Sequence, residues 1–488
     1  MTGPYVIGVE DILVALRADR WMVAGILGAN YLLACVCAVR EVMNSRTSQG
    51  SIAWLLSLLL LPFPTSLLYL IFGWKSFDNY ARDRLQLGRA LRPLRARDLA
   101  LLDEPMCKAW PVLTNVAEIP FLSGNKVELL IDGQQTFDSI FDGIRRAEYY
   151  LLVQFYILRD DRLGRELADL LIERARAGVR VHLLYDEVGS NGLPRRYRAR
   201  LRAGGVKVAA FNQRHRFLRF YGPTRLNYRN HRKIVVADGE HAWIGGLNVG
   251  VEYLGEDKRY GPWRDTHVRV RGPAALAAGL VFREDWEWAT GELLPSDPPE
   301  VVPVPGEQPV LVMPTGPADR LEECAIAFTD VIAQARERLW IATPYFVPDV
   351  DVRTALFAAQ LRGVDVRLLL PEKRDHWTVW LASIAHADSM VQHDISVYRY
   401  TEGFMHQKVV LMDDRLCSVG TVNFDNRSFA INFEVTLWFP HQHAIADVER
   451  MLEADFARCR QVGDEEVAGR PWVMKFITQA ARLLSPIL

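Results

Sequence analysis

The sequence has few cysteines and no excess of charge of either sign. Its six cysteines are scattered along 488 residues without a C-x-x-C pair, which excludes a zinc ribbon and a disulfide scaffold. Lysine and arginine number 58 against 59 aspartate and glutamate, a formal net charge of -1. This near neutrality excludes a protein that coats nucleic acid through general basicity. Apolar residues make up 50% of the chain, which is typical of packed globular proteins.

Charge is missing altogether from two stretches in the first 75 residues. Trp21–Val39 is 19 residues long and Ala53–Gly73 is 21, and a helix needs about 20 apolar residues to cross a bilayer. Arg40, Glu41 and Arg46 lie between the stretches. We therefore predict a membrane anchor over residues 1–75, formed by a hairpin of two transmembrane helices at about 21–39 and 53–73.

Two prolines in the second stretch, Pro62 and Pro64, predict a kink in that helix. The first stretch could instead be a signal peptide, and the hairpin could instead be buried in a soluble core. Leu32–Cys35 resembles a lipoprotein cleavage site, but the apolar run continues to Val39, which disfavours a signal peptide. A hairpin buried in a soluble core is disfavoured because core helices are seldom so uniformly apolar.

The anchor is flanked by basic residues. Arg17 and Arg20 precede it, and residues 76–110 form a basic juxtamembrane segment. The positive-inside tendency places both flanks in the cytoplasm, where the segment would lie against anionic lipids.

Beyond residue 110 the sequence repeats itself. Each copy has an amphipathic helix, an apolar strand with an aromatic pair, another helix, Gly-Val and a second strand; the aromatic pairs are Phe155-Tyr156 and Tyr345-Phe346. This alternation predicts an α/β fold with mainly parallel sheets. We place domain 1 at residues 111–290, a proline-rich linker at 291–310 and domain 2 at 311–488.

Both copies end in the pattern H-x-K-x4-D, followed ten residues later by asparagine. The members are His231, Lys233, Asp238 and Asn248 in the first copy, and His406, Lys408, Asp413 and Asn423 in the second. Histidine and lysine at i and i+2 of a strand project from the same face, about 6.6 Å apart along it. The aspartate falls where the strand gives way to a turn.

These residue types suit attack on phosphorus. Neutral imidazole is a nucleophile near neutral pH, lysine balances charge on phosphate oxygens, and asparagine adds a hydrogen-bond donor. One histidine cannot also protonate the departing alkoxide, so two copies would supply a nucleophile and a general acid. An acidic residue follows each motif, and we expect Asp265 to orient His231 and Glu434 to orient His406. The sequence has no H-E-x-x-H or Cys/His cluster, so no metal is predicted.

The duplicated motif resembles the phospholipase D superfamily, and nearly the whole chain resembles bacterial cardiolipin synthases with two membrane spans. The matching blocks are AWLLSLLLLPFP, YLIFG, NHRKIVVADGEHAWIGGLNVGVEYLG, WRDTHVRVRGPA, PYFVPD, GFMHQKVVLMDD, VGTVNFDNRSFAINFEVTL and ARLLSPIL. The resemblance implies two phospholipase D-like α/β domains and an active site built from the His, Lys and Asp of both motifs.

The same resemblance implies an activity. Two phosphatidylglycerol molecules would give cardiolipin and glycerol through a phosphatidyl-histidine intermediate, with no cofactor. By superfamily analogy His231 is the nucleophile. The expected partners are phosphatidylglycerol and anionic membrane lipids rather than nucleic acid, and the expected location is the bacterial inner membrane, as a multi-pass protein whose catalytic domains face the cytoplasm.

Two rival functions stay open at this point. A membrane-bound hydrolase of the superfamily, either a phospholipase D or a nuclease, would use water as the acceptor, and a lipid-binding scaffold would have no turnover. The stretch Arg214–Tyr221 mixes cations with aromatics. That composition fits an interfacial surface, an ordinary solvated loop or a nucleic-acid groove equally well.

Overall fold

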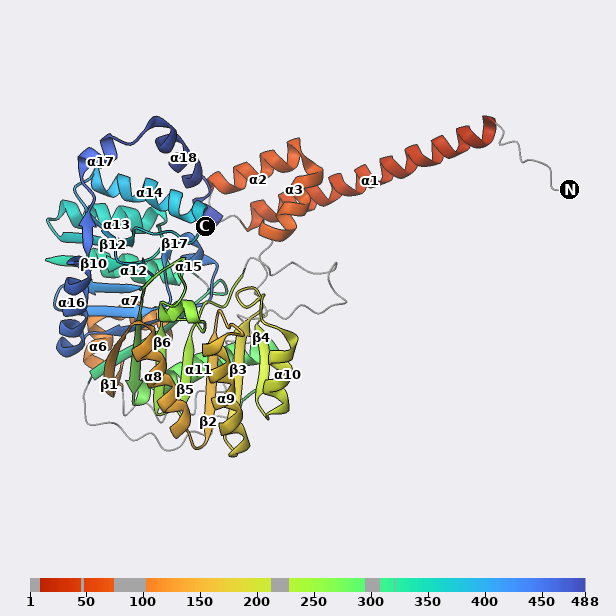
Figure 1. Cartoon of the computed structure of the whole chain (residues 1–488). Coiled ribbons are helices and arrows are strands. Elements are labelled where there is room, and N and C mark those ends of the chain that lie inside the picture. Colours follow the sequence, from red (N-terminus) through yellow and green to blue (C-terminus); the bar gives the residue numbers. More distant parts are fainter. Residues whose placement is uncertain are drawn as a thin grey trace. The chain divides into compact units, whose positions relative to one another are not determined.

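The computed structural model describes residues 9–44, 48–73, 102–211, 228–294, 308–319 and 321–487. These residues fall into two compact units (Figure 1). One contains the N-terminal helices and the other contains both repeats. The predicted surface at Arg214–Tyr221, most of the basic segment at 76–110 and most of the linker at 291–310 lie outside the described residues.

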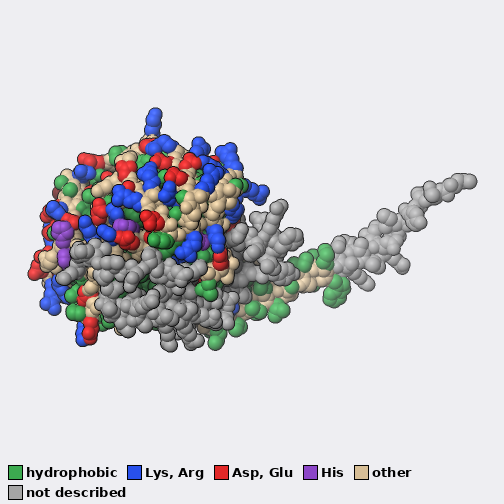
Figure 2. Space-filling model, turned by 90° about the horizontal axis from the view of Figure 1, so that it is seen from below, with side chains coloured by type: hydrophobic (Ala, Val, Ile, Leu, Met, Phe, Trp, Pro, Cys, Tyr) green, Lys and Arg blue, Asp and Glu red, His purple; other side chains and the backbone are tan. Residues whose placement is uncertain are grey.

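The N-terminal unit begins with one long helix, α1 (Val9–Met43). Its part Trp21–Met43 spans 23 residues and, among the described residues, is the one helix long and apolar enough to cross a membrane by length and composition. Hydrophobic side chains lie along this helix in Figure 2.

The second predicted span is interrupted. It consists of α2 (Ser48–Leu60), α3 (Pro62–Leu68) and a π-helical turn, η1 (Tyr69–Gly73). Leu61 leaves the helical conformation, with φ -133° and ψ 63°, because a residue that precedes proline is disfavoured in a helix. The kink predicted at the prolines is therefore confirmed, although the span is not one continuous helix.

Glu41 does not belong to the connection between the helices, where the sequence had placed it. It lies in α1 and is buried. Its carboxylate accepts hydrogen bonds from Ser51 Oγ at 2.7 Å and from the Tyr69 hydroxyl at 3.0 Å. These bonds join α1 to α2 and to η1.

The large unit is built on one sheet of 15 strands that runs through both repeats. Strands β1 and β9, the first of each repeat, pair with each other and join the halves. In spatial order the strands are β19 (Cys459–Gln461), β13 (Ser396–Tyr400), β12 (Asp365–Pro371), β10 (Arg338–Ala342), β15 (Val409–Met412), β16 (Leu416–Gly420), β18 (Glu434–Phe439), β9 (Gln308–Thr315), β1 (Leu122–Ile131), β8 (Thr266–Arg271), β6 (His241–Gly245), β5 (Ile234–Ala237), β2 (Tyr150–Phe155), β3 (Arg180–Asp186) and β4 (Lys207–Phe211).

The α/β fold class is confirmed, but the sheet is mixed rather than mainly parallel. Within the 15-stranded sheet, parallel pairing is confined to β2, β3 and β4 in the first half and to β10, β12 and β13 in the second. These are the strands that alternate with helices. The motif strands β5 and β15 instead turn back tightly into β6 and β16, which makes the centre of the sheet antiparallel. Two further pairs are β7 (Trp263–Arg264) with β14 (Phe404–Met405) and β11 (Phe346–Val347) with β17 (Phe424–Asp425).

Helices cover both faces of the sheet (Figure 1). They are α6 (Glu104–Ala109), α7 (Pro111–Ala117), α8 (Asp132–Arg146), α9 (Arg162–Arg176), α10 (Arg195–Ala203), α11 (Pro273–Thr290), α12 (Glu323–Gln334), α13 (Val350–Leu361), α14 (Trp377–Val391), α15 (Asn426–Ala430), α16 (Gln442–Phe456), α17 (Asp464–Ala468) and α18 (Trp472–Arg482), with 3-10 turns η4 (Val251–Leu254) and η5 (Ser485–Ile487). Helices α11 and α16 share one apolar core that extends under both halves. The opposite face has a separate core in each half, beneath α8 and α9 and beneath α12 and α13. The shared core holds the two halves at a fixed distance, which is what a site assembled from both of them requires.

Candidate active site

The two motif histidines sit where the halves meet. Each lies three residues before its motif strand and donates its backbone N–H to the other half: His231 N to Phe433 O at 2.9 Å, and His406 N to Arg264 O at 2.8 Å. The acceptors immediately precede Glu434 and Asp265 in the chain. A pseudo-twofold arrangement of backbone bonds therefore places each histidine beside the acidic residue of the opposite repeat.

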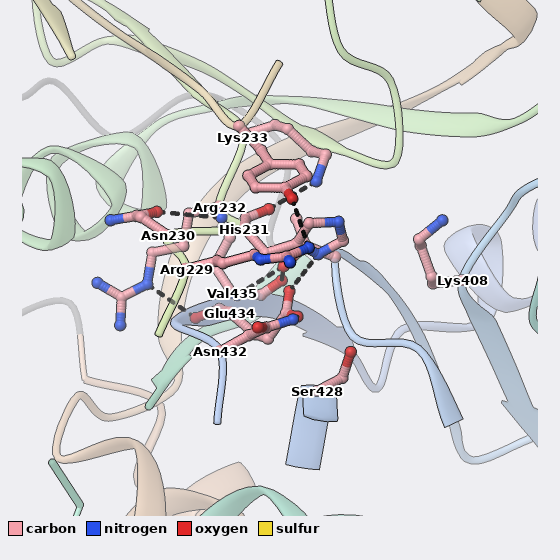
Figure 3. A network of polar contacts seen from close by, with 12 residues as sticks. Arg229, Asn230, His231, Arg232, Lys233, Lys408, Ser428, Asn432, Glu434 and Val435 are labelled. Carbon is pink, nitrogen blue, oxygen red and sulfur yellow. Dashed lines mark hydrogen bonds and ion pairs between the residues drawn. The ribbon is translucent and has the colours of Figure 1, made fainter. Parts of the chain in front are cut away.

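The carboxylate pairing is crossed, and this corrects our expectation. Glu434 Oε2 lies 2.9 Å from His231 Nδ1, and Asp265 Oδ2 lies 2.9 Å from His406 Nδ1. Sequence order alone pairs each histidine with the acidic residue of its own repeat. The structure exchanges the partners because the backbone bridges bring the strand of one half against the motif of the other. Figure 3 shows His231 and Glu434 in contact.

Both histidines are buried, and burial lowers the pKa of His231 to about 4 and that of His406 to about 4. Glu434 opposes the shift at His231, and Asp265 opposes it at His406. A neutral ring whose Nδ1–H is donated to a carboxylate keeps its lone pair on Nε2. Each imidazole is thus held in the tautomer that leaves Nε2 available for chemistry.

The two lysines lie beside the histidines of their own motifs. Lys233 Nζ donates to His231 O at 2.6 Å, and Lys408 Nζ contacts His406 O and lies 2.8 Å from His406 Nδ1. Burial lowers the pKa of Lys233 to about 7 and that of Lys408 to about 8. Figure 3 shows Lys233 above His231 and Lys408 across from them. Each lysine also depresses the pKa of His231, so both ammonium groups act on one centre.

The two asparagines differ in their surroundings. Asn248 Oδ1 accepts from Ile157 N at 3.0 Å, and its Nδ2 donates to the Tyr253 hydroxyl at 3.2 Å. Asn423 is buried, and its Oδ1 has no hydrogen-bond partner among the described residues. Asn248 therefore already braces the loop after β2 as well as standing near its motif.

The motif aspartates do not join this centre, which corrects their assignment as catalytic residues. Asp238 and Asp413 lie at the far ends of β5 and β15 in the left-handed conformation, with φ 54° and 49°. The Asp238 carboxylate accepts the backbone N–H groups of residues 148–150 at 2.8 Å, and Asp413 accepts those of residues 336–338 at 2.9–3.3 Å. Each carboxylate joins its motif strand to the neighbouring strand, because it accepts hydrogen bonds from the backbone N–H groups at the start of that neighbour.

Two buried ion pairs that the sequence analysis missed support the carboxylates. Arg232 donates from NH1 to Asp285 at 2.8 Å and from Nε to Glu434 O at 2.9 Å. Arg264 binds Asp455 through two nitrogens at 2.8 Å each. Arg232 fills the variable position of the first motif, and Arg264 precedes Asp265. Nothing in the sequence pairs them with their partners, which lie 53 and 191 residues away.

One tyrosine lies on each histidine, and here the pseudo-symmetry breaks. Tyr156 packs edge-on to His231 with ring centroids 4.9 Å apart, and Tyr345 packs on His406 at 6.2 Å. The Tyr156 hydroxyl accepts from Arg229 at 3.0 Å, whereas the Tyr345 hydroxyl donates to Asp375. The repeated aromatic pair in the sequence was the signal for these tyrosines. The charges of their partners are opposite, so the two half-sites are not equivalent.

Within the described residues, no group of three or more His, Cys, Asp or Glu side chains could hold a metal ion. The arrangement offers two imidazoles, two lysines, one of which lies 3.2 Å from His406 Nε2, and two buried carboxylates. Such a set can hold a phosphodiester and exchange its ester group through a covalent intermediate.

Two known protein families match this chain, and one of them matches the two regions that contain the motifs. The family described as "Cardiolipin synthase, PLD-like domain" matches residues 140–258 and 328–456, and the family described as "Phospholipase D-nuclease N-terminal" matches residues 32–74. Proteins named "Cardiolipin synthase A" are similar along nearly the full chain. The protein from Pseudomonas syringae pv. syringae is 43% identical over 96% of this chain and 99% of its own length, and one from Pseudomonas fluorescens is 44% identical over 94% and 97%.

Among solved structures, phosphatidylserine synthase from Haemophilus influenzae has the same fold. It aligns with a TM-score of 0.58 and 17% identity, covering 78% of this chain and all of that one. At this identity the likeness concerns the fold alone.

Proposed function

Because the chain belongs to the family of bacterial cardiolipin synthases with phospholipase D-like domains, we propose that it transfers a phosphatidyl group from one phosphatidylglycerol to another. The products are cardiolipin and glycerol. The observation that carries this proposal is the pair of buried histidines, each held through Nδ1 by a carboxylate from the opposite repeat. Neither half contains a complete catalytic unit.

The first step forms a covalent intermediate. His231 Nε2 attacks the phosphorus of the donor lipid, and the bond from phosphorus to the glycerol oxygen breaks. For this step His406 must carry a second proton, on Nε2; it gives that proton to the glycerol oxygen, which releases glycerol and leaves a phosphatidyl-histidine. Glu434 balances the positive charge that develops on His231.

The second step reverses the first with a new alcohol. His406, now neutral, takes the proton of a terminal hydroxyl of the second phosphatidylglycerol, and the oxygen attacks the phosphatidyl-histidine. Cardiolipin forms and His231 is restored. Lys233 and Lys408 stabilise the non-bridging oxygens in both steps, with Asn248 and Asn423 as further donors. Equivalent phosphodiesters are broken and made, so no nucleotide is consumed.

The charge asymmetry supports His231 as the nucleophile. Asp265 and Asp375 raise the pKa of His406 against burial and Lys408, which lower it, and Asp375 is bonded to the tyrosine that packs on this ring. Arg229 lies on the other side, bonded to the tyrosine that packs on His231.

We further propose a multi-pass location in the bacterial inner membrane with the catalytic unit in the cytoplasm. The apolar part of α1, the kinked second segment and the basic flanks support this. Phosphatidylglycerol and other anionic lipids are then the partners at the membrane surface.

One incubation of the purified full chain with phosphatidylglycerol vesicles tests the proposal. Cardiolipin and glycerol in equal amounts support the transferase. Phosphatidic acid would show a hydrolase, and no turnover would show a scaffold. His231→Ala and His406→Ala should each abolish synthesis, since each removes a role that the other histidine cannot take. Full activity of either variant would refute the two-histidine mechanism.

A further inference from the structure

The last helix of the chain carries apolar side chains on its outer face. In α18 (Trp472–Arg482), Trp472 is 74% exposed and Phe476 62%, and Val473 and Ile477 are also exposed. We call these four residues the α18 face. Leu483 and Leu484 follow the helix and are exposed as well. Large apolar side chains gathered in this way on a surface mark a site of interaction.

Helix α18 packs on the protein through a narrow face of small side chains, and its large apolar side chains lie on the exposed face. Thr478 and Ala481 are buried, and Ala481 packs with Ala382 of α14. Helix α18 lies against α14 (Figure 1). With about 100° between successive residues, the α18 face lies roughly opposite these inward positions. The apolar side chains are therefore not needed to hold α18 on the protein.

The charged residues in the sequence of α18 and of the segment that follows it are all basic. Residues 467–488 contain no aspartate or glutamate, whereas Lys475 and Arg482 lie in the helix along one edge of the α18 face. The rings of Trp472 and Phe476 stack with their centroids 5.7 Å apart and form one continuous aromatic surface. Aromatic and aliphatic residues beside cations form the composition that binds an interfacial helix to anionic lipid.

The helix is also tied to the active site. Asn426 Nδ2 donates to Ser485 O at 3.0 Å and to Val347 O at 3.1 Å. Asn426 begins α15, three residues after Asn423. The end of the chain that follows α18 is thus bonded to the segment that leaves the second half-site.

We infer that the α18 face lies in the headgroup region of the bilayer and sets the catalytic unit down on the membrane that contains its lipid substrate. This inference rests on the proposed function for the identity of that substrate. The chain would then have two separate attachments, its N-terminal anchor and this helix. The second would raise the local concentration of lipid at the site without taking part in the chemistry.

Kinetics with two physical forms of one lipid test the inference. The full-length Trp472→Glu/Phe476→Glu double variant is compared with Leu361→Glu, which changes a side chain on α13 that is 88% exposed. On phosphatidylglycerol vesicles we expect the double variant to raise KM about tenfold or more, since burial of each ring is lost. On short-chain phosphatidylglycerol below its micelle concentration, the double variant and the control should both match the wild type.

Equal losses on both forms of the lipid would mean that α18 supports the fold, and no loss on vesicles would overturn the docking role. If the wild type made no cardiolipin from either form, the proposed function would fail. Contact between Trp472 and lipid can also be measured without turnover.

Tryptophan quenching supplies that independent test. The full chain is reconstituted into vesicles with and without brominated acyl chains. Wild-type fluorescence should contain a quenched component that disappears in Trp472→Phe, which keeps the apolar ring and the activity on vesicles. The same quenching in both proteins would place Trp472 away from lipid. A change from dimer to monomer in the double variant, with quenching unaffected, would assign the face to a second copy of the chain.

Discussion

The two carboxylates that hold the motif histidines can be replaced by amides one at a time. Glu434→Gln changes the residue 2.9 Å from His231 Nδ1, and Asp265→Asn changes the residue 2.9 Å from His406 Nδ1. Each amide keeps the size of the side chain and loses its negative charge. If His231 is the nucleophile, the first variant should slow formation of the intermediate and the second should slow protonation of the leaving group.

The size of the effect follows from the burial of both groups. Glu434 and Asp265 are fully buried, so no water replaces the lost charge. A hydrogen bond to a charged partner contributes about 1.5–3 kcal/mol, and each variant should therefore make cardiolipin roughly ten- to hundredfold more slowly. The overall rate falls in both cases and does not separate the two roles.

A substrate with a different leaving group separates them. In phosphatidyl-p-nitrophenol the leaving group departs as a stable anion and needs no general acid. Rapid mixing with this substrate should give a burst of p-nitrophenolate as the intermediate forms. We expect the burst to survive in Asp265→Asn and to be lost in Glu434→Gln. Asp414→Asn, which changes an exposed carboxylate next to the second motif, serves as the control.

The pattern of losses decides between the possibilities. Loss of the burst in His231→Ala together with Asp265→Asn would refute the crossed pairing of carboxylates and histidines. Loss in His406→Ala together with Asp265→Asn would keep that pairing and reverse the roles of the two histidines.

Three further predictions concern stability, pH and the second half-site. Asp238→Ala removes the acceptor of three backbone N–H groups and should cost about 2 kcal/mol of folding stability, measured as a lower unfolding temperature, while the folded fraction keeps its turnover number. Because burial lowers the pKa of Lys233 to about 7 and that of Lys408 to about 8, kcat/KM should fall as rising pH removes these charges; Lys233→Arg should move the fall to higher pH, and an unmoved profile would contradict the assignment. Asp375→Asn removes a charge that favours protonated His406, so turnover of phosphatidylglycerol should drop while the p-nitrophenolate burst persists; equal loss of both would contradict this role.

Several features of this protein follow from short stretches of sequence. The apolar run of α1, the break before Pro62 and the two motifs depend on neighbours within one helix or one strand, where spacing alone decides the outcome. The repeat also shows that two half-sites exist, since each copy carries the same chemistry at the same spacing. Local pattern was sufficient for these conclusions because the interactions involved are themselves local.

The direction of the central strands could not be predicted from local sequence patterns. Helices between strands correctly indicated the parallel pairs among β2, β3 and β4 and among β10, β12 and β13, but β5 and β15 return through tight turns and make the centre antiparallel. A catalytic role for the motif aspartates was implied by the resemblance to the phospholipase D superfamily. Their recurrence instead reflects one structural task performed in each half, the satisfaction of backbone donors at the start of a neighbouring strand.

The sequence by itself indicated the histidines and lysines of the two motifs and showed that the motif is present twice. Only the tertiary structure decided which carboxylate serves which histidine, because Glu434 and His231 are 203 residues apart and Asp265 and His406 are 141 apart. Both carboxylates lie downstream of equivalent motifs, so sequence order favours the pairing within a repeat. The packing of one half against the other reverses it, since backbone bonds between the halves bring each motif to the opposite strand.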